Sequence, residues 1–378
     1  MSPSLRFPEF TGEWENKRIG DIGKFFSGGT PSSSRKDFYG GEIPFIRSGE
    51  IHSDKTELFL TQEGYKNSSA KMVEVGDILL ALYGANSGDI SISQMRGAIN
   101  QAILCIRTNV APVFFKSVWE KHAQKILNTY LQGGQGNLSA DIVKKITISI
   151  PSQIEQAKIA ALFSHLDERI SIQNRLIEDL KKLRCAIIEK MFKQSKANGR
   201  LGDFIEQVSV RNKNGLYSNV LSVSNKQGFV KQSEQFEDRT VASEDTSNYK
   251  IVKRNNFAYN PARINVGSIA RLTKFDVGIV SPMYVCFRTK ASIIPEYMEA
   301  FFTSQQFFYE MMKRLEGSVR LCLSYEGLCN IPVYIPDMNK QIAMGQNISL
   351  ILSKIGLEIE YLGRLHQQKQ YLLRKMFI

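Results

Sequence analysis

The chain has 378 residues, of which 43% are hydrophobic and 23% are charged. This length favours two domains, and this composition is typical of a globular protein and excludes a disordered one. The formal net charge is +12, which favours a polyanionic partner. More than half of that excess lies in two segments that we predict to be helical, so a merely basic surface is an equal alternative.

The sequence disfavours secretion, membrane insertion, a disulfide framework and a metal site. The first residues, Met1–Arg6, include no stretch resembling a signal peptide, and apolar runs such as Ile78–Leu82 are too short to cross a bilayer. We therefore expect a cytoplasmic protein with no membrane partner. The five cysteines form no Cys-x-x-Cys pair and the four histidines are scattered, so we expect no disulfide framework and no metal site.

The predicted elements indicate two α+β domains, each followed by a long helix. Short apolar strands at 42–46, 77–82, 103–106 and 146–150 are separated by Gly, Ser and Asn clusters. A helix over 113–130 precedes the last of these strands, and a helix over 295–315 takes the same place in the second half. We predict a first domain over 1–151, a helix over 152–198, a second domain over 199–336 and a second helix over 337–378.

The second half of the chain repeats the first. When Pro151 is aligned with Pro336, the following stretch matches without a gap, and Gln156 falls opposite Gln341. Both copies close on Lys-Met-Phe, which ends at Phe192 and at Phe377. Nearer the front, Gly88-Asp89-Ile90 matches Gly267-Ser268-Ile269, and Cys105–Thr108 matches Cys286–Thr289. The chain therefore contains an internal duplication.

The two repeated tails carry a seven-residue apolar pattern, which predicts a coiled-coil seam. At 1.5 Å per residue, ~40 residues make a rod of roughly 60 Å. The alternative is one separate amphipathic helix on each domain. If the two helices pair, the connectivity requires them to run antiparallel, with the domains related by a pseudo-twofold axis, as duplex DNA is. The predicted seam consists of Phe163, Leu166, Ile170, Ile177, Leu180 and Ile187, with Ile348, Ile351, Ile355, Leu362, Leu365 and Leu372.

This organisation resembles the specificity (S) subunit of type I restriction-modification systems, over essentially the whole chain. The resemblance implies two target recognition domains, each of which reads half of a bipartite, asymmetric DNA site. It also implies that the helices set the spacing and dock two methyltransferase subunits, with nuclease-translocase subunits as optional additions. The second repeat differs where Asn255-Asn256 replaces Gly76-Asp77. The motifs that carry the resemblance are Leu5–Phe10, Trp14, Gly20-Asp21-Ile22, Phe26–Pro31, Val75–Leu79, Ile150-Pro151 and Glu155-Gln156.

Bases are read in the major groove by side chains with paired donors or acceptors, which are expected on loops between strands. Each single arginine has a solvated surface charge as its alternative, and Tyr83 and Tyr284 are core candidates as well. The turns 27–30 and 133–137 could offer backbone amides to phosphates or be ordinary loops. The DNA-contact candidates are Arg47, Tyr83, Asn86, Arg96 and Gln101 in the first domain, and Arg239, Arg263, Asn265, Tyr284 and Arg320 in the second.

We expect no catalytic centre and no cofactor. The chain has no Gly-x4-Gly-Lys-Ser/Thr motif, and the string nearest to an Asn/Asp-Pro-Pro-aromatic methyltransferase site is Tyr259–Ala262, which lacks the second proline and the aromatic residue. The sequence thus predicts a non-catalytic recognition subunit. The alternatives are a coiled-coil scaffold or adaptor whose domains bind protein, and an enzyme with an unrecognised site.

Overall fold

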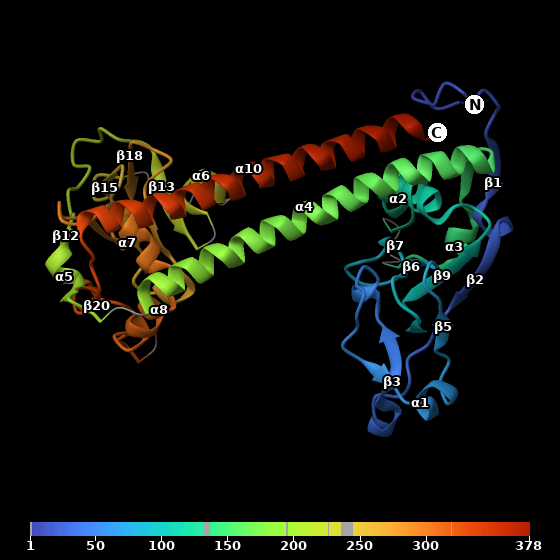
Figure 1. Ribbon diagram of the computed structural model, residues 1–378, viewed down its shortest axis with the longest axis horizontal. Coiled ribbons are helices and arrows are strands. Elements are labelled where there is room, and N and C mark those ends of the chain that lie inside the picture. Colours follow the sequence, from blue (N-terminus) through green and yellow to red (C-terminus); the bar gives the residue numbers. More distant parts are fainter. Residues whose placement is uncertain (1, 132–136, 194–195, 226, 236–244, 319) are drawn as a thin grey trace. The chain divides into compact units, whose positions relative to one another are not determined.

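The structure is a computed structural model that describes residues 2–131, 137–193, 196–225, 227–235, 245–318 and 320–378. The chain divides into two compact units (Figure 1). Unit 1 consists of Met1–Asn174 with Glu360–Ile378, and unit 2 consists of Arg175–Ile359. Each unit therefore combines one globular domain with a part of both long helices, α4 (Gln153–Lys193) and α10 (Met338–Met376).

Unit 1 contains two four-stranded sheets and the helices α1 (Gln62–Lys66), α2 (Pro112–Leu131) and α3 (Ala140–Lys145). Strands β3 and β8 are parallel, and the other described pairs in these two sheets are antiparallel. The first sheet has the order β2 (Gly23–Ser27), β9 (Ile103–Thr108), β6 (Ile78–Ala81), β7 (Ile90–Ile92), and the second has the order β4 (Phe59–Leu60), β3 (Tyr39–Ile46), β8 (Gly97–Ile99), β5 (Lys71–Val73). A two-stranded sheet joins β1 (Glu15–Arg18) to β10 (Thr147–Ile150).

The first sheet of unit 1 is buried on both faces. Successive side chains of a strand point to opposite faces, and all four residues of β6 are buried. Ile78 and Leu80 belong to the core with α2 and the helix ends, whereas Leu79 and Ala81 pack with the second sheet. A strand covered on both faces reads as a continuous apolar run, which is why 77–82 lacks polar alternation.

Unit 2 has the same sheet topology, which confirms the internal repeat. Among its described strands the parallel pair is β13 with β18, in the place of β3 with β8. One sheet has the order β12 (Ile205–Gln207), β19 (Val285–Thr289), β16 (Phe257–Tyr259), β17 (Ile269–Arg271), and the other has the order β14 (Gly228–Lys231), β13 (Val220–Ser224), β18 (Val277–Val280), β15 (Lys250–Lys253). The remaining elements are β11 (Gly199–Arg200), β20 (Pro332–Val333), α5 (Leu201–Phe204), α6 (Gln232–Gln235), α7 (Pro295–Phe302), α8 (Gln305–Met312) and α9 (Tyr325–Cys329).

The predicted mixed α+β fold is confirmed, with one correction among the helices. The expected single helix over 295–315 is two helices, α7 and α8, which are separated at Thr303-Ser304. The reason is a new N-cap, because the Ser304 hydroxyl accepts a hydrogen bond from the Phe307 amide at 3.1 Å. In unit 1 the helix predicted over 113–130 is the continuous α2.

The repeated glutamine and phenylalanine of the two tails have matching structural roles. Gln156 accepts from the Ala111 amide and donates to the Pro151 carbonyl, and Gln341 makes the same kind of contacts with Ile294 and Pro336. At the other end of each helix, the ring of Phe377 packs against Trp14, Phe114 and Phe163 in unit 1. The ring of Phe192 packs against Tyr297 and Phe301 in unit 2.

Within each unit the two long helices pack antiparallel, as expected. In unit 1 Lys369, late in α10, forms an ion pair of 2.8 Å with Asp167, early in α4. In unit 2 Ile188, late in α4, shares a core cluster with Ile348, early in α10. All twelve predicted seam residues are buried or partly buried, although Ile188 and Leu373 are more deeply buried than the neighbouring Ile187 and Leu372. Over the described residues, none of the helices has the length and apolar character to cross a membrane.

Asn255-Asn256 reproduces the geometry of Gly76-Asp77. Gly76 has φ +96°, and Asn255 has φ +69°, a left-handed conformation that asparagine tolerates better than most residues. The Asp77 carboxylate accepts from the Glu74 amide at 2.8 Å, and the Asn256 side-chain oxygen accepts from the Lys253 amide at 2.7 Å. The sequence departure in the second repeat therefore leaves the turn unchanged.

Candidate nucleic-acid interface

The carboxyl ends of four strands of unit 1 converge on one edge, which we call the loop edge. Strands β3 and β8 run in parallel, with Ile46 opposite Ile99, so the residues after both strands emerge together. Strands β2 and β6 end beside the start of β9, where Ser27 lies opposite Leu104 and Ala81 opposite Ile103. The loops that follow these four strands carry most of the candidates predicted in the first domain.

Arg47 directly follows β3 on the loop edge, and two carboxylates hold its guanidinium group. Its Nε and Nη2 atoms lie 3.1 and 2.8 Å from the Glu50 carboxylate, and Nη2 lies 2.9 Å from Glu57. The hydrogen bonds from Arg47 stabilise the ionised form of Glu50 and lower its pKa to about 2. The side chain of Arg47 remains 41% exposed, so it is at once fixed and accessible.

Tyr83, Asn86 and Gln101 lie on the same edge. Tyr83 is exposed, and the backbone of the preceding Leu82 donates to the Ala102 carbonyl at 2.8 Å. Asn86 is partly buried and lies next to Gly49, two residues beyond Arg47. The side-chain oxygen of exposed Gln101 accepts from Thr30 at 2.6 Å.

The Gly-Gly turn after β2 is explained by close packing. A Cβ atom on Gly28 would lie 1.7 Å from the Ile99 carbonyl oxygen, so no other residue fits there. The phosphate-binding role suggested for 27–30 stays a prediction. The second such turn, 133–137, lies outside the described residues except for Asn137.

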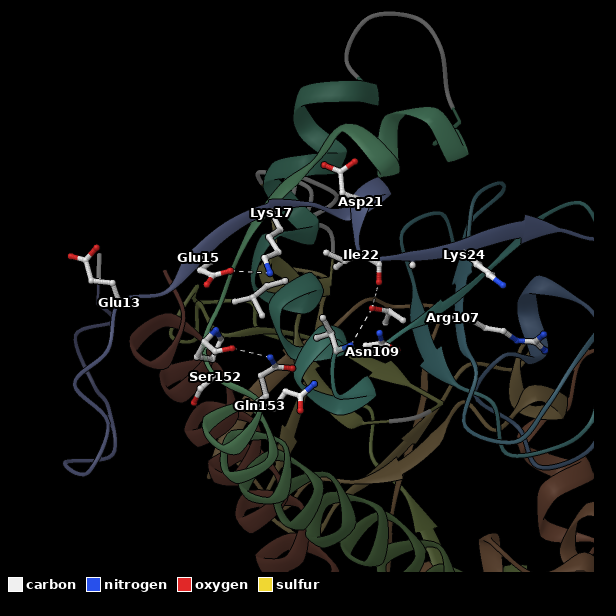
Figure 2. Close-up of a pocket in the computed structure, with 16 residues that line it drawn as sticks. Glu13, Glu15, Lys17, Asp21, Ile22, Lys24, Arg107, Asn109, Ser152 and Gln153 are labelled. Atoms are coloured by element: carbon white, nitrogen blue, oxygen red, sulfur yellow. Dashed lines mark hydrogen bonds and ion pairs between the residues drawn. The ribbon is translucent and has the colours of Figure 1, made fainter.

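Arg96 is the first-domain candidate that does not join this group. It precedes β8, at the strand's amino end, and pairs with Glu74 at 3.1 Å. The nearby ends of β2 and β9 border a cavity of about 920 Å³, shown in Figure 2. Its lining mixes Glu13, Glu15 and Asp21 with Lys17, Lys24 and Arg107. This cavity therefore belongs to the end of the unit away from the loop edge and has no single sign of charge.

Unit 2 presents an equivalent loop edge with different side chains. Arg263 and Asn265 lie in the loop after β16, and the Pro261 carbonyl of that loop accepts from the Leu323 amide at 3.1 Å. This contact places the 316–322 turn, which carries exposed Arg320, beside the same loop. Neither Arg263 nor Arg320 forms an ion pair within the described part of the chain. Asn265 occupies the place of Asn86, since each lies two residues before a glycine of positive φ.

Two second-domain candidates are not found among the exposed residues of the unit 2 loop edge. Tyr284 is 9% exposed and packs in a core cluster with Leu221 and Cys286, so the structure supports the core alternative for it and not a base contact. Its alignment partner in the first repeat is Ile103, which is fully buried. This apolar residue at the equivalent position already indicated a core position for Tyr284. Arg239 lies outside the described residues.

The edges also contain residues that the sequence interpretation missed. Asn100 follows β8, and its side chain accepts from the Ala102 amide at 3.1 Å. In unit 2 Asn225 follows β13 beside Gly267, and the exposed Met283 follows β18. The repeat alignment could have identified them, because positions after equivalent strands are equivalent.

Comparison with known proteins agrees with this architecture. Residues 11–182 match the model of the type I restriction modification DNA specificity domain. The MjaIX specificity subunit of Methanocaldococcus jannaschii is 28% identical over 194 residues, which cover 48% of this chain and 44% of that protein. The HindI specificity subunit of Haemophilus influenzae is 28% identical over 186 residues, which cover 45% of this chain and 39% of that protein. In both cases less than half of the relative's own length is matched.

Solved structures resemble the whole chain. The S subunit of a type I restriction-modification system from M. genitalium superposes with a TM-score of 0.63 at 17% identity, covering 100% of this chain and 99% of that one. A chain from a study of complex assembly and conformational transition of the type I system gives a TM-score of 0.56 at 13% identity, covering 97% and 98%. At these identities the likeness shows the fold. Together with the matched domain and the curated relatives, it supports a type I restriction modification DNA specificity domain over residues 11–182, in a chain that is similar in fold throughout to type I specificity subunits.

Proposed function

We propose that each unit reads one half of a bipartite, asymmetric DNA site through its loop edge. The observation that carries this proposal is that one topology is used twice with different side chains: Arg47, Asn86 and Gln101 on one edge, and Arg263, Asn265 and Arg320 on the other. Equivalent surfaces with unequal chemistry suit two unequal half-sites. Arginine, asparagine and glutamine are the side chains that recognise guanine and adenine in the major groove.

We further propose that the long helices set the spacing between the half-sites and dock two methyltransferase subunits. Apolar side chains are exposed along them, including Ile172 and Leu176 on α4 and Leu350 and Leu357 on α10. Exposed apolar groups of this kind mark protein-binding surfaces when they gather on one element. In this proposal adenine methylation, and cleavage where nuclease-translocase subunits join, belong to the partners.

The test is to purify the chain with its methyltransferase partner and map the methylated adenines in DNA. The proposal predicts two short sequence blocks separated by a fixed gap. Inserting one heptad into both helices should lengthen the gap and leave both blocks unchanged, and an unchanged gap would reject the spacing role.

A protein-binding adaptor is the alternative, and salt distinguishes it. Phosphate contacts release counterions, so DNA affinity should fall steeply as salt rises. If the chain does not bind DNA, or if its affinity for DNA changes with neither salt concentration nor sequence, the adaptor is favoured.

A further inference from the structure

Glu50 is the centre of a hydrogen-bond network on the loop edge of unit 1. Its carboxylate accepts from the Arg47 side chain and backbone amide, from the Thr56 hydroxyl at 3.1 Å and from the Glu57 amide at 3.2 Å. The Glu50 side chain is only 15% exposed. A carboxylate with this many partners is fixed in place, and it fixes the arginine that it binds.

The contacts divide the Arg47 guanidinium into two edges. Nε and Nη2 donate side-on to the two oxygens of Glu50. The adjacent end-on edge is formed by Nη1 and the second hydrogen of Nη2. Nη1 has no hydrogen-bond partner among the described residues, and the only described group on this edge is Glu57, whose side chain is 84% exposed. A flexible, solvated carboxylate is readily displaced because exposed ion pairs contribute little free energy.

The Nη1–Nη2 edge offers two parallel N–H donors, the pattern that matches O6 and N7 of guanine. An arginine already held in one rotamer loses less conformational entropy when it binds. Arg47 thus differs from Arg263, which has no described ion pair to hold it.

We propose that Arg47 reads one guanine through its Nη1–Nη2 edge, that Glu50 is the positioning residue that presents this edge, and that Glu57 occupies the edge until DNA displaces it. The inference rests on the proposed function, in which the loop edge of unit 1 faces the major groove. It narrows that function to a G·C pair at one position of one half-site.

The experiment uses the full chain with its methyltransferase subunits and the split target selected from random duplexes. Each guanine of the target is replaced in turn by 7-deazaguanine, which lacks the N7 acceptor. At one position this replacement should weaken binding by about 10- to 100-fold for the natural chain. The same replacement should change nothing for Arg47→Ala or for Arg47→Lys, whose ammonium group lacks the fork.

The variants of the two glutamates then separate positioning from folding. Glu50→Gln should lose base preference at the same position as Arg47→Ala and keep it elsewhere. Glu57→Gln should keep the preference and bind at least as tightly. Arg96→Ala, which breaks an ion pair at the other end of β8, is the matched control and should leave all positions unchanged.

Several results would overturn the inference. One is that the position at which recognition depends on Arg47 is not a guanine. Another is that Glu50→Gln weakens binding equally on all sequences although its circular dichroism is unchanged. A third is that Glu57→Gln abolishes the base preference. If Glu50→Gln fails to fold, the 7-deazaguanine experiment with the natural chain and with Arg47→Lys still tests whether Arg47 reads a guanine. Selection of no split target would overturn the proposed function as well, whereas a split target insensitive to Arg47→Ala overturns this inference alone.

Discussion

Units 1 and 2 differ where one side chain of a long helix meets the globular domain. In unit 1 Lys369 forms ion pairs of 2.7 Å with Glu120 and 2.8 Å with Asp167, and Lys116 pairs with the same aspartate. Burial alone raises the pKa of Asp167, but its hydrogen bonds with both lysines more than offset this, and the pKa lies below its ordinary value.

In unit 2 the repeat places Arg184 where Lys369 stands, but the counterpart of Asp167 is Leu352. The Arg184 Nε atom is buried with no hydrogen-bond partner among the described residues, and the side chain borders a cavity of about 310 Å³ with Glu296 and Glu299. Topology and helix anchoring are thus shared by the repeats, whereas polar pairs have diverged.

The anchoring phenylalanines should matter equally in both units. Phe377→Ala and Phe192→Ala each remove a buried ring from an aromatic cluster, so each should lower the free energy of unfolding by about 3–5 kcal/mol in chemical denaturation. Phe308→Ala, at an exposed position of α8, is the control and should change it by less than about 0.5 kcal/mol. A loss confined to one of the two variants would break the equivalence of the repeats.

The charged pairs should matter unequally. Lys369→Met leaves the mostly buried Asp167 and Glu120 with Lys116 as their remaining cation, so the expected loss is about 2–3 kcal/mol, at or below the lower end of the ~3–5 kcal/mol typical of a buried pair broken outright. Arg184→Met removes an unsatisfied donor and should cost less than about 1 kcal/mol. Equal losses in urea denaturation would contradict the structural difference between the units.

The two left-handed turns should respond alike to a Cβ atom without a polar group. Gly76→Ala and Asn255→Ala should each destabilise by roughly 1–2 kcal/mol, because left-handed backbone is costly for alanine. Asn255→Gly should stay within about 0.5 kcal/mol of the natural chain. Thermal unfolding measures all three, and tolerance of alanine at either site would show that the turns are not equivalent.

The smallest effect concerns pH. The folded pKa of Glu50 is about 2, below the ~4.3 of an unfolded glutamate, so its ion pair stabilises the fold above about pH 4.3 and is lost as the pH falls towards 2. Since Arg47 is 41% exposed, solvent screening keeps the contribution small. The melting temperature of Glu50→Gln should fall less steeply than that of the natural chain in this window, and parallel curves would count against a strong pair.

Much of the fold was predictable because it is periodic or duplicated. The apolar heptads predicted both long helices, and the apolar run at 77–82 predicted a strand, which the structure buries on both faces. The break between α7 and α8 was missed, since one serine cap outweighs an otherwise helical stretch. Asn255-Asn256 looked like divergence, yet its backbone and hydrogen bond match those of Gly76-Asp77.

The sequence predicted the loops on which the candidate residues lie better than it predicted the side chains with which these residues interact. Arg47, Tyr83, Asn86 and Gln101 follow or precede strands whose ends meet, which the strand order explains. Arg96 lies at the amino end of β8, away from the loop edge, and no sequence pattern shows at which end of a short strand a neighbouring residue lies relative to the other candidates. The carboxylate that holds Arg47 was not foreseen, because Glu50 acts through a 3₁₀ turn that composition does not reveal.

We propose that two equivalent edges read separate halves of one target. The most direct measurement is the recognition sequence of the natural chain, of Arg47→Ala and of Arg263→Ala, each assembled with its methyltransferase partner and mapped by the positions of methylated adenine. We predict that Arg47→Ala relaxes one position in one half, that Arg263→Ala relaxes one position in the other, and that the gap is unchanged. Changes in the same half, or an equal weakening on all sequences, would contradict it.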